Sequence, residues 1–159
     1  MRIKTIGLLS LLAIVIFISC EKKEETQPKY FSDAQKSALK VFEGRFESVD
    51  IIPGVDTLKT AIVFLEQYNP PIEATYTDYE TKEKTKFYVH GKYRYEYVDG
   101  KTTSEKYYYI SSDANYIYSS PSLNTMSIKE QNLKIVSETT FRVKEEKDIL
   151  WYTYNKVAE

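Results

Sequence analysis

Tyrosine is the most unusual chemistry-bearing residue of this chain, with 15 copies among 159 residues. A phenol joins an apolar ring to a hydroxyl, so tyrosines that share a surface can enclose and orient a small guest. Between residues 92 and 97 tyrosines alternate with charged residues, which places them on one face of a strand. The residues that we expect to line a ligand site are Tyr93, Tyr95, Tyr97, Tyr107, Tyr109 and Trp151.

These aromatic residues also have a plain structural interpretation. Tyrosine favours strands and often packs its ring inside a fold with the hydroxyl at the rim. Trp151 can in the same way fill a core instead of facing a ligand. On the binding interpretation, stacked tyrosine faces suit a sugar ring, and a tyrosine-lined pocket suits an amphipathic small molecule. The sequence leaves the structural and the binding interpretation open.

Patterns for catalysis and metal binding are missing from the sequence. The one histidine, His90, has no Gly-x-Ser-x-Gly nucleophile motif to serve, so we expect it to be structural or exposed. One cysteine and one histidine exclude multi-cysteine zinc sites and HExxH sites. A formal net charge of −1 gives no reason to expect nucleic acid. We therefore expect no enzyme, metal or cofactor, although a carboxylate pair assembled in space is compatible with the sequence.

The only cysteine, Cys20, follows an apolar N-terminal segment. Arg2 and Lys4 precede the nearly uninterrupted apolar run 6–18, which has the length of a signal-peptide core and is short for a membrane span. A small residue, then Cys20, then a charged run resembles the lipobox of bacterial lipoproteins, with Phe17 standing where leucine is usual. The resemblance implies cleavage before Cys20, acylation of its thiol and new amine, and attachment to a membrane.

This resemblance divides the chain into a signal peptide at 1–19, a charged tether at 20–31 and a folded domain at 32–159. Lys23-Glu24-Glu25 resembles the signal that sends some Bacteroidetes lipoproteins to the outer face of the outer membrane, although a plain spacer has the same composition. We expect attachment to the outer membrane and leave the side open. Asp56-Thr57-Leu58 resembles a Bacteroidetes O-glycosylation acceptor, which makes Thr57 a weak candidate for modification.

The elements that must position the aromatic residues are mostly strands. Ser32 and Gln35 have the spacing of a capping box, which predicts a short helix over 33–40. After it the apolar period changes from about 3.6 to 2. Predicted strands cover 41–49, 57–66, 72–79, 86–98, 103–110, 116–119, 125–129, 133–138, 140–144 and 149–157.

Most of these strands are joined by short turns, which predicts an antiparallel, mainly up-and-down sheet. Pro53-Gly54, Asp99-Gly100 and Gln131-Asn132 are turn signals, and Gly91 inside a strand predicts a bulge or bend. Eight to ten such strands should close into a barrel or pack as a sandwich. We expect the barrel, because closure removes exposed strand edges.

The order of these features resembles the lipocalin-like domains of Bacteroidetes lipoproteins. The match covers 32–157 and includes one short helix, a strand with Gly44-Arg45-Phe46, a chain of hairpins, and an aromatic last strand at 151–157. The resemblance implies a barrel that can hold a small amphipathic or glycan ligand. The alternative is a packed barrel that serves as an interaction or accessory module of a cell-envelope complex, through Pro70-Pro71 or the loop at 119–124.

Overall fold

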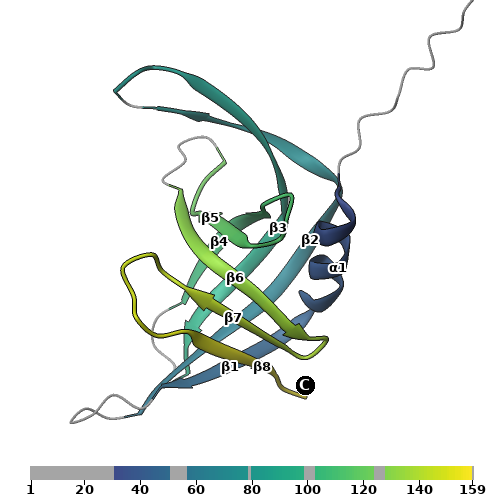
Figure 1. Cartoon of the computed structure of the whole chain (residues 1–159), viewed down its shortest axis with the longest axis vertical. Coiled ribbons are helices and arrows are strands. Elements are labelled where there is room, and N and C mark those ends of the chain that lie inside the picture. Colours follow the sequence, from purple (N-terminus) through teal and green to yellow (C-terminus); the bar gives the residue numbers. More distant parts are fainter. Residues whose placement is uncertain (1–30, 51–56, 79, 99–102, 124–127, 159) are drawn as a thin grey trace, which may run out of the picture.

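Within the described residues, eight antiparallel strands follow one another around a closed barrel, and one short helix precedes them (Figure 1). The computed structural model describes residues 31–50, 57–78, 80–98, 103–123 and 128–158. The expected all-β, up-and-down barrel with a short N-terminal helix is confirmed. The elements are α1 (Asp33–Val41), β1 (Gly44–Asp50), β2 (Leu58–Thr77), β3 (Lys84–Tyr97), β4 (Thr103–Ile110), β5 (Tyr116–Ser120), β6 (Lys129–Ser137), β7 (Thr140–Lys144) and β8 (Tyr152–Lys156).

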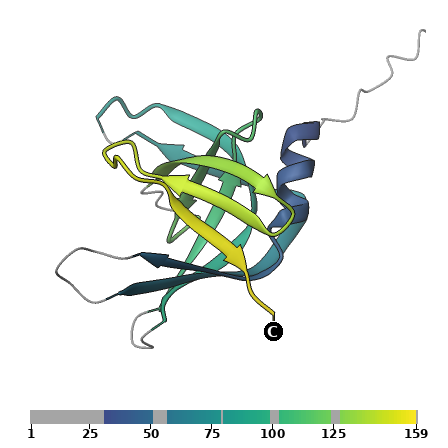
Figure 2. The same cartoon turned by 60° about the horizontal axis from the view of Figure 1, so that its bottom comes forward.

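Helix α1 covers one end of the barrel, away from the loop between β7 and β8 (Figure 2). The predicted capping box is present: Gln35 N–H donates to Ser32 Oγ at 3.0 Å, and Ser32 N–H donates to Gln35 Oε1 at 2.8 Å. The side-chain Nε2 of Gln35 also donates to the carbonyl oxygen of Ile110 at 2.8 Å, which connects the helix to β4. Ala38 and Val41 are buried against the strands. The helix thus closes the barrel with its apolar side.

Aromatic rings fill the half of the barrel beneath α1. Phe42, which ends the helix, stacks on Phe64 of β2 with ring centroids 4.5 Å apart. Phe141 of β7 meets Phe42 and Phe46 edge to face at 5.2 and 5.0 Å. Tyr108 of β4 packs on the same group, and all five side chains are buried. Such contacts add to the stabilisation from apolar burial, so this half of the barrel is solid.

Strands β2 and β3 continue beyond the barrel as a curved arm (Figure 1). Strand β1 pairs with β2 only over 58–64, and β4 pairs with β3 only over 91–96. The register of β2 against β3 shifts near Gln67, which is the paired partner of Gly91. An irregularity is therefore present at Gly91 as expected, but the extra residues, 68–71, belong to β2 and not to the strand that carries Gly91. The arm leaves the barrel at this point.

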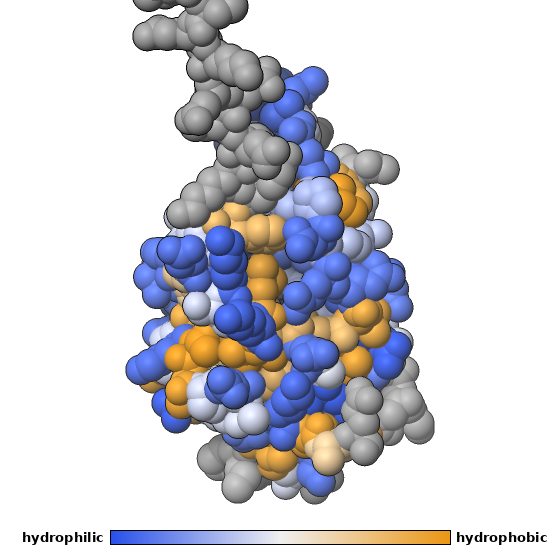
Figure 3. Space-filling view, turned by 90° about the vertical axis from the view of Figure 1, so that its right-hand side faces the viewer, coloured by the Kyte–Doolittle hydropathy of each residue, from blue (hydrophilic) through white to orange (hydrophobic). Residues whose placement is uncertain are grey.

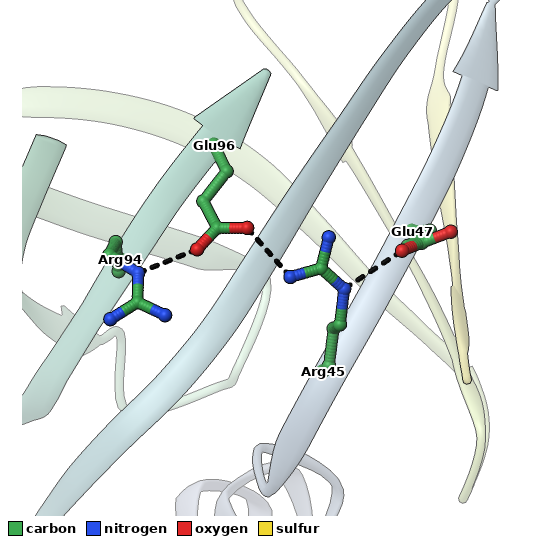
Figure 4. A network of polar contacts seen from close by, with 4 residues as sticks. All are labelled: Arg45, Glu47, Arg94 and Glu96. Atoms are coloured by element: carbon green, nitrogen blue, oxygen red, sulfur yellow. Dashed lines mark hydrogen bonds and ion pairs between the residues drawn. The ribbon is translucent and has the colours of Figure 1, made fainter. Parts of the chain in front are cut away.

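On the outer face, an ionic chain crosses the barrel wall from β1 to β3 (Figure 4). Arg45 Nε contacts Glu47 at 2.8 Å, its Nη1 contacts Glu96 at 2.6 Å, and Arg94 contacts the other oxygen of Glu96 at 2.6 Å. Ala61 of β2 pairs with both Glu47 and Glu96 and is fully covered. A methyl side chain here leaves room for the arginine to cross the middle strand. The hydrogen bonds of the two arginines hold the pKa of Glu96 below its usual range.

Several predicted boundaries were wrong. The predicted strands at 57–66 and 72–79 form the single strand β2, and Pro70-Pro71 lies inside it, at the irregular pairing between residues 67 and 72. A bulge accommodates proline because it interrupts the ladder that needs the missing N–H. The predicted turn Gln131-Asn132 lies within β6 and pairs with β5. Val41 belongs to the helix. Of the proposed contact loop at 119–124, Ser119 and Ser120 belong to β5.

Other predictions fall outside the described residues. They are the signal peptide at 1–19, the tether at 20–31 except for its last residue, Cys20 with the charged signal that follows it, the turns at 53–54 and 99–100, and residues 125–127 of one predicted strand.

Candidate ligand-binding cavity

The end of the barrel opposite α1 contains a cavity of about 400 Å³. Five tyrosines lie on its wall: Tyr93, Tyr95 and Tyr97 from β3, and Tyr152 and Tyr154 from β8. All five follow the period-2 alternation of their strands, which turns every second side chain inward. Strands β3 and β8 thus supply most of the aromatic surface. The chain places rings from positions almost 60 residues apart around one space.

The tyrosines of β3 form a gradient from the base of the cavity to its mouth. Tyr93 is 5% exposed and contacts the aromatic core through Phe64, with ring centroids 6.1 Å apart. Tyr95 is half-buried, and Tyr97 is 37% exposed and meets Tyr95 edge to face at 5.5 Å. Burial raises the pKa of Tyr93 to about 12 and also raises the pKa of Tyr95. Both phenols are neutral at physiological pH and can donate hydrogen bonds.

Hydroxyl groups give the wall a polar component. Thr60 Oγ1 and Tyr154 Oη lie 3.1 Å apart and share a buried hydrogen bond. Burial raises the pKa of Tyr154 above its ordinary value, so its proton is retained. Ser104 of β4 and Gln131 of β6 also face the cavity. The wall therefore combines aromatic faces with a small number of hydrogen-bonding groups, as small-molecule sites commonly do.

Four charged side chains line the same space. Lys129 of β6 and Glu145, which directly follows β7, form an ion pair with each other. Lys106 of β4 is half-buried, and its Nζ lies 5.9 Å from the centroid of the Tyr95 ring. Burial lowers the pKa of Lys106 and raises that of Asp50 at the end of β1. Asp50 Oδ2 is buried without a hydrogen-bond partner among the described residues.

Tyr107 and Tyr109 do not line the cavity, contrary to the prediction. Strand β4 turns Lys106 and Tyr108 inward, so its remaining tyrosines face outward. Tyr109 lies between Phe87 at 4.8 Å and Tyr118 at 4.4 Å, both stacked on it. Since both faces of its ring are covered, Tyr109 cannot stack on a sugar.

Tyr107 packs beside the small cluster of Ala74 and Val89 beneath the arm. The Lys92 ammonium group also lies 5.8 Å from the centroid of its ring. These contacts join the arm to the barrel wall, so the position of Tyr107 has a structural explanation.

Trp151 takes neither of its expected roles. It precedes β8, is 38% exposed, and lies outside both the core and the cavity wall. The Lys144 Nζ lies 5.5 Å from the centroid of its ring. Its neighbours Tyr152 and Tyr154 face the cavity instead, and the sequence analysis missed both. The sequence did contain a signal for them: adjacent residues of a strand face opposite sides, so Tyr152 and Tyr154 must face the side that Trp151 does not.

The remaining candidate residues lie apart from the cavity. His90 is 2% exposed and accepts the Ile110 N–H through Nδ1 at 2.9 Å. Thr57 is exposed just before β2. In the described part of the chain, no group of three or more His, Cys, Asp or Glu residues is arranged to hold a metal ion.

None of the helical residues described by the structure forms a segment with the length and apolar character needed to cross a bilayer.

Comparison with known proteins gave no match. No protein-family model matches the chain, and no curated protein and no solved structure matches it.

Proposed function

We propose that this protein binds a small amphipathic molecule in the hollow half of its barrel and performs no catalysis. The observation that supports the proposal is the cavity of about 400 Å³ with five tyrosines on its wall. This volume falls within the range of about 300–1,000 Å³ that is typical of small-molecule sites. A glycan is the second ligand class that the tyrosine hydroxyls and rings would suit.

The proposed binding mode follows from the gradient of burial along β3. An apolar body would enter between Tyr97 and Tyr152 at the mouth and rest on Tyr93 and Tyr95. The aromatic plug around Phe42 limits how deep it can reach. Neutral phenols would donate hydrogen bonds to its polar groups. The ligand is therefore expected to be short.

We further propose that the barrel is held at the bacterial outer membrane by acylated Cys20. The support is the sequence pattern of a basic start, an apolar run and a small residue before the single cysteine. Residues 20–31 would act as a charged tether. Such an anchor would place the cavity close to a source of amphipathic molecules, on the periplasmic or the external side.

Binding can be tested with the neutral fluorescent probe N-phenyl-1-naphthylamine and purified full-length protein in phosphatidylcholine nanodiscs. The matched variants are Ser104→Trp, which narrows the cavity, and Thr103→Trp, which adds the same ring to the outward side of β4. We expect saturable binding whose affinity falls at least about tenfold in Ser104→Trp and less than about twofold in Thr103→Trp. Equal effects of the two variants, or no binding above empty nanodiscs, would refute the proposal.

The alternative function is a protein-interaction module, and one feature favours it. The arm of β2 and β3 leaves the barrel with edges that no other described strand pairs with, and it carries exposed Ile72 and Tyr88. On the side of the molecule that carries α1, hydrophilic residues interrupt the apolar surface (Figure 3). Absence of probe binding in the experiment above would favour this alternative, with the arm as the contact element.

A further inference from the structure

Two basic and two acidic residues line the cavity, but only one of the two possible ion pairs is present among the described residues. Lys129 and Glu145 form an ion pair and neutralise each other at the cavity wall. Lys106 and Asp50 form no ion pair within the described part of the chain. Strand β4, which carries Lys106, is separated from β1, which carries Asp50, by two strands in one direction and four in the other. The two charges therefore belong to different walls.

Lys106 is the unusual group of this pair. Its side chain points into the barrel between Tyr93, its cross-strand partner, and the Tyr95 ring at 5.9 Å. Removing an ammonium group from water without a counterion is unfavourable, and burial lowers the pKa of Lys106 accordingly. The nearby tyrosine supplies a cation–π contact, and the charges of Lys129 and Glu145 shift the pKa of Lys106 in opposite directions. Because Lys106 forms no ion pair with any residue that the structure describes, its ammonium group is free to bind an anion that enters the cavity.

We infer that the ligand of this cavity is an amphipathic anion whose acidic group binds Lys106 while its apolar body lies against Tyr93 and Tyr95. The inference rests on the proposed binding function and specifies the ligand class. A carboxylate, sulfonate or phosphate would supply the counterion that Lys106 lacks. Neutral phenols and hydroxyls near it can donate further hydrogen bonds to an anion.

Asp50 gives the site a direction. Its Oδ2 is buried without a partner and can accept a hydrogen bond, but it would repel a second acidic group. The ligand is therefore acidic on the β4 side of the cavity and carries a hydroxyl, an amide or no polar group toward β1. A molecule with acidic groups at both ends would bind poorly.

Two probes with the same ring system test the inference in the full-length protein in phosphatidylcholine nanodiscs. They are the anion 8-anilinonaphthalene-1-sulfonate and the neutral N-phenyl-1-naphthylamine, which lacks the sulfonate. The variants are Lys106→Gln and a matched control, Lys134→Gln, at an exposed position of β6. We expect Lys106→Gln to weaken binding of the anion at least tenfold and of the neutral probe less than twofold. Lys134→Gln should change neither, and Lys106→Arg should restore most of the affinity for the anion.

Each outcome is informative. Equal binding of the anion by wild type and Lys106→Gln overturns the inference, whereas binding of the neutral probe still supports the cavity function. Failure of wild type to bind either probe overturns both. Thermal unfolding checks the fold, and Lys106→Met, which keeps the apolar stem, serves as a second variant if the glutamine variant unfolds. A loss of affinity for both probes in a folded Lys106→Met protein would also contradict the inference.

Discussion

His90 occupies the position at which β3 separates from β4. Its Nδ1 accepts the Ile110 N–H at 2.9 Å, and its ring lies 5.3 Å from that of Phe31. The pairing of β3 with β4 begins only at Gly91, so the imidazole satisfies a backbone donor that has no ladder partner. An imidazolium could not accept this hydrogen bond, because both its nitrogens are protonated. Burial lowers the pKa of His90 to about 4, consistent with this role.

This pKa predicts a loss of stability in mild acid. The unfolded chain protonates its histidine near pH 6.5 but the folded protein does so only near pH 4, so unfolding takes up a proton between these values. The contribution of neutral His90 to the free energy of unfolding is complete above pH 6.5. It falls by about 3 kcal/mol as the pH approaches 4. His90→Asn keeps an acceptor but cannot titrate.

Urea unfolding of wild type and His90→Asn between pH 7.5 and pH 4 measures this effect. We expect the variant to be less stable at pH 7.5, because it loses ring packing, and the difference to shrink toward pH 4. A difference that does not vary with pH would contradict the low pKa of His90. The comparison also cancels the titration of carboxylates, which both proteins share.

The sequence predicted the inward tyrosines of β3 better than those of β4 for a physical reason. Tyr93, Tyr95 and Tyr97 alternate with charged residues, so one face is fixed by the polarity of the other. Strand β4 has three tyrosines in succession, 107–109, and such a run does not reveal which side faces inward. In the observed register of β3 and β4, Tyr108 pairs with Gly91 and packs closely against it. This contact joins two strands, so the sequence of β4 alone does not show it.

Strands β2 and β3 show at the scale of elements why the arm leaves the barrel where it does. Gly91 pairs with Tyr108 on one side and with Gln67 on the other. A Cβ atom at Gly91 would lie 2.2 Å from the Glu66 carbonyl oxygen and 2.8 Å from the Tyr108 hydroxyl. The strands can approach this closely only because residue 91 has no side chain.

Gly91→Ala should therefore be strongly destabilising. The nearest obstacle is a backbone atom, which cannot move without disturbing the pairing of β2 and β3, so we expect a loss of about 3 kcal/mol or more in the free energy of unfolding. Thr85→Ala, at an exposed position of the same strand, is the control and should cost about 1 kcal/mol or less. Chemical denaturation monitored by circular dichroism gives both values. A loss below 1 kcal/mol in Gly91→Ala would show that the strands relax without penalty.

The sequence indicated where strands lie more reliably than where they end. Pro70-Pro71 predicted a break, but the bulge next to it keeps both halves within β2. Gln131-Asn132 predicted a turn, yet these residues pair with Ile117 and Tyr116 of β5 and form part of the continuous strand β6. Local turn preference is worth little against a full set of ladder hydrogen bonds, and the sequence does not show where those bonds will form.

The whole molecule divides into a solid half beneath α1 and a hollow half at the opposite end. Short turns and alternation predicted closure of the sheet, since closure follows from strand number and connectivity. They did not predict which half would be filled. Phe42 helps to fill the helix end because it leaves α1 directly over the barrel, and among the described residues no helix covers the other end. The position of the cavity thus depends on where the one described helix lies.

The proposed lipid anchor at Cys20 concerns the whole molecule, and the variant Cys20→Ser tests it. If the thiol carries a lipid, the wild-type protein should begin at residue 20, exceed the mass of its polypeptide by the acyl groups, and sediment with the envelope. Cys20→Ser should lose the added mass and the cleavage before residue 20. Ser19→Ala keeps a small residue at that site and should be processed normally.

The barrel provides an internal control for this experiment, because residues 31–158 contain its strands and helix and do not include Cys20. Cys20→Ser should therefore unfold at the same temperature as wild type, which separates loss of the anchor from loss of the fold. Two acyl chains hold a protein firmly, since each buried methylene contributes about 0.8 kcal/mol, so partial release of wild type is not expected. Intact mass spectrometry and envelope fractionation decide the matter. A wild-type mass equal to that of the bare polypeptide would remove the membrane from the proposed function while leaving the cavity and its ligand class to be judged by the probe experiments.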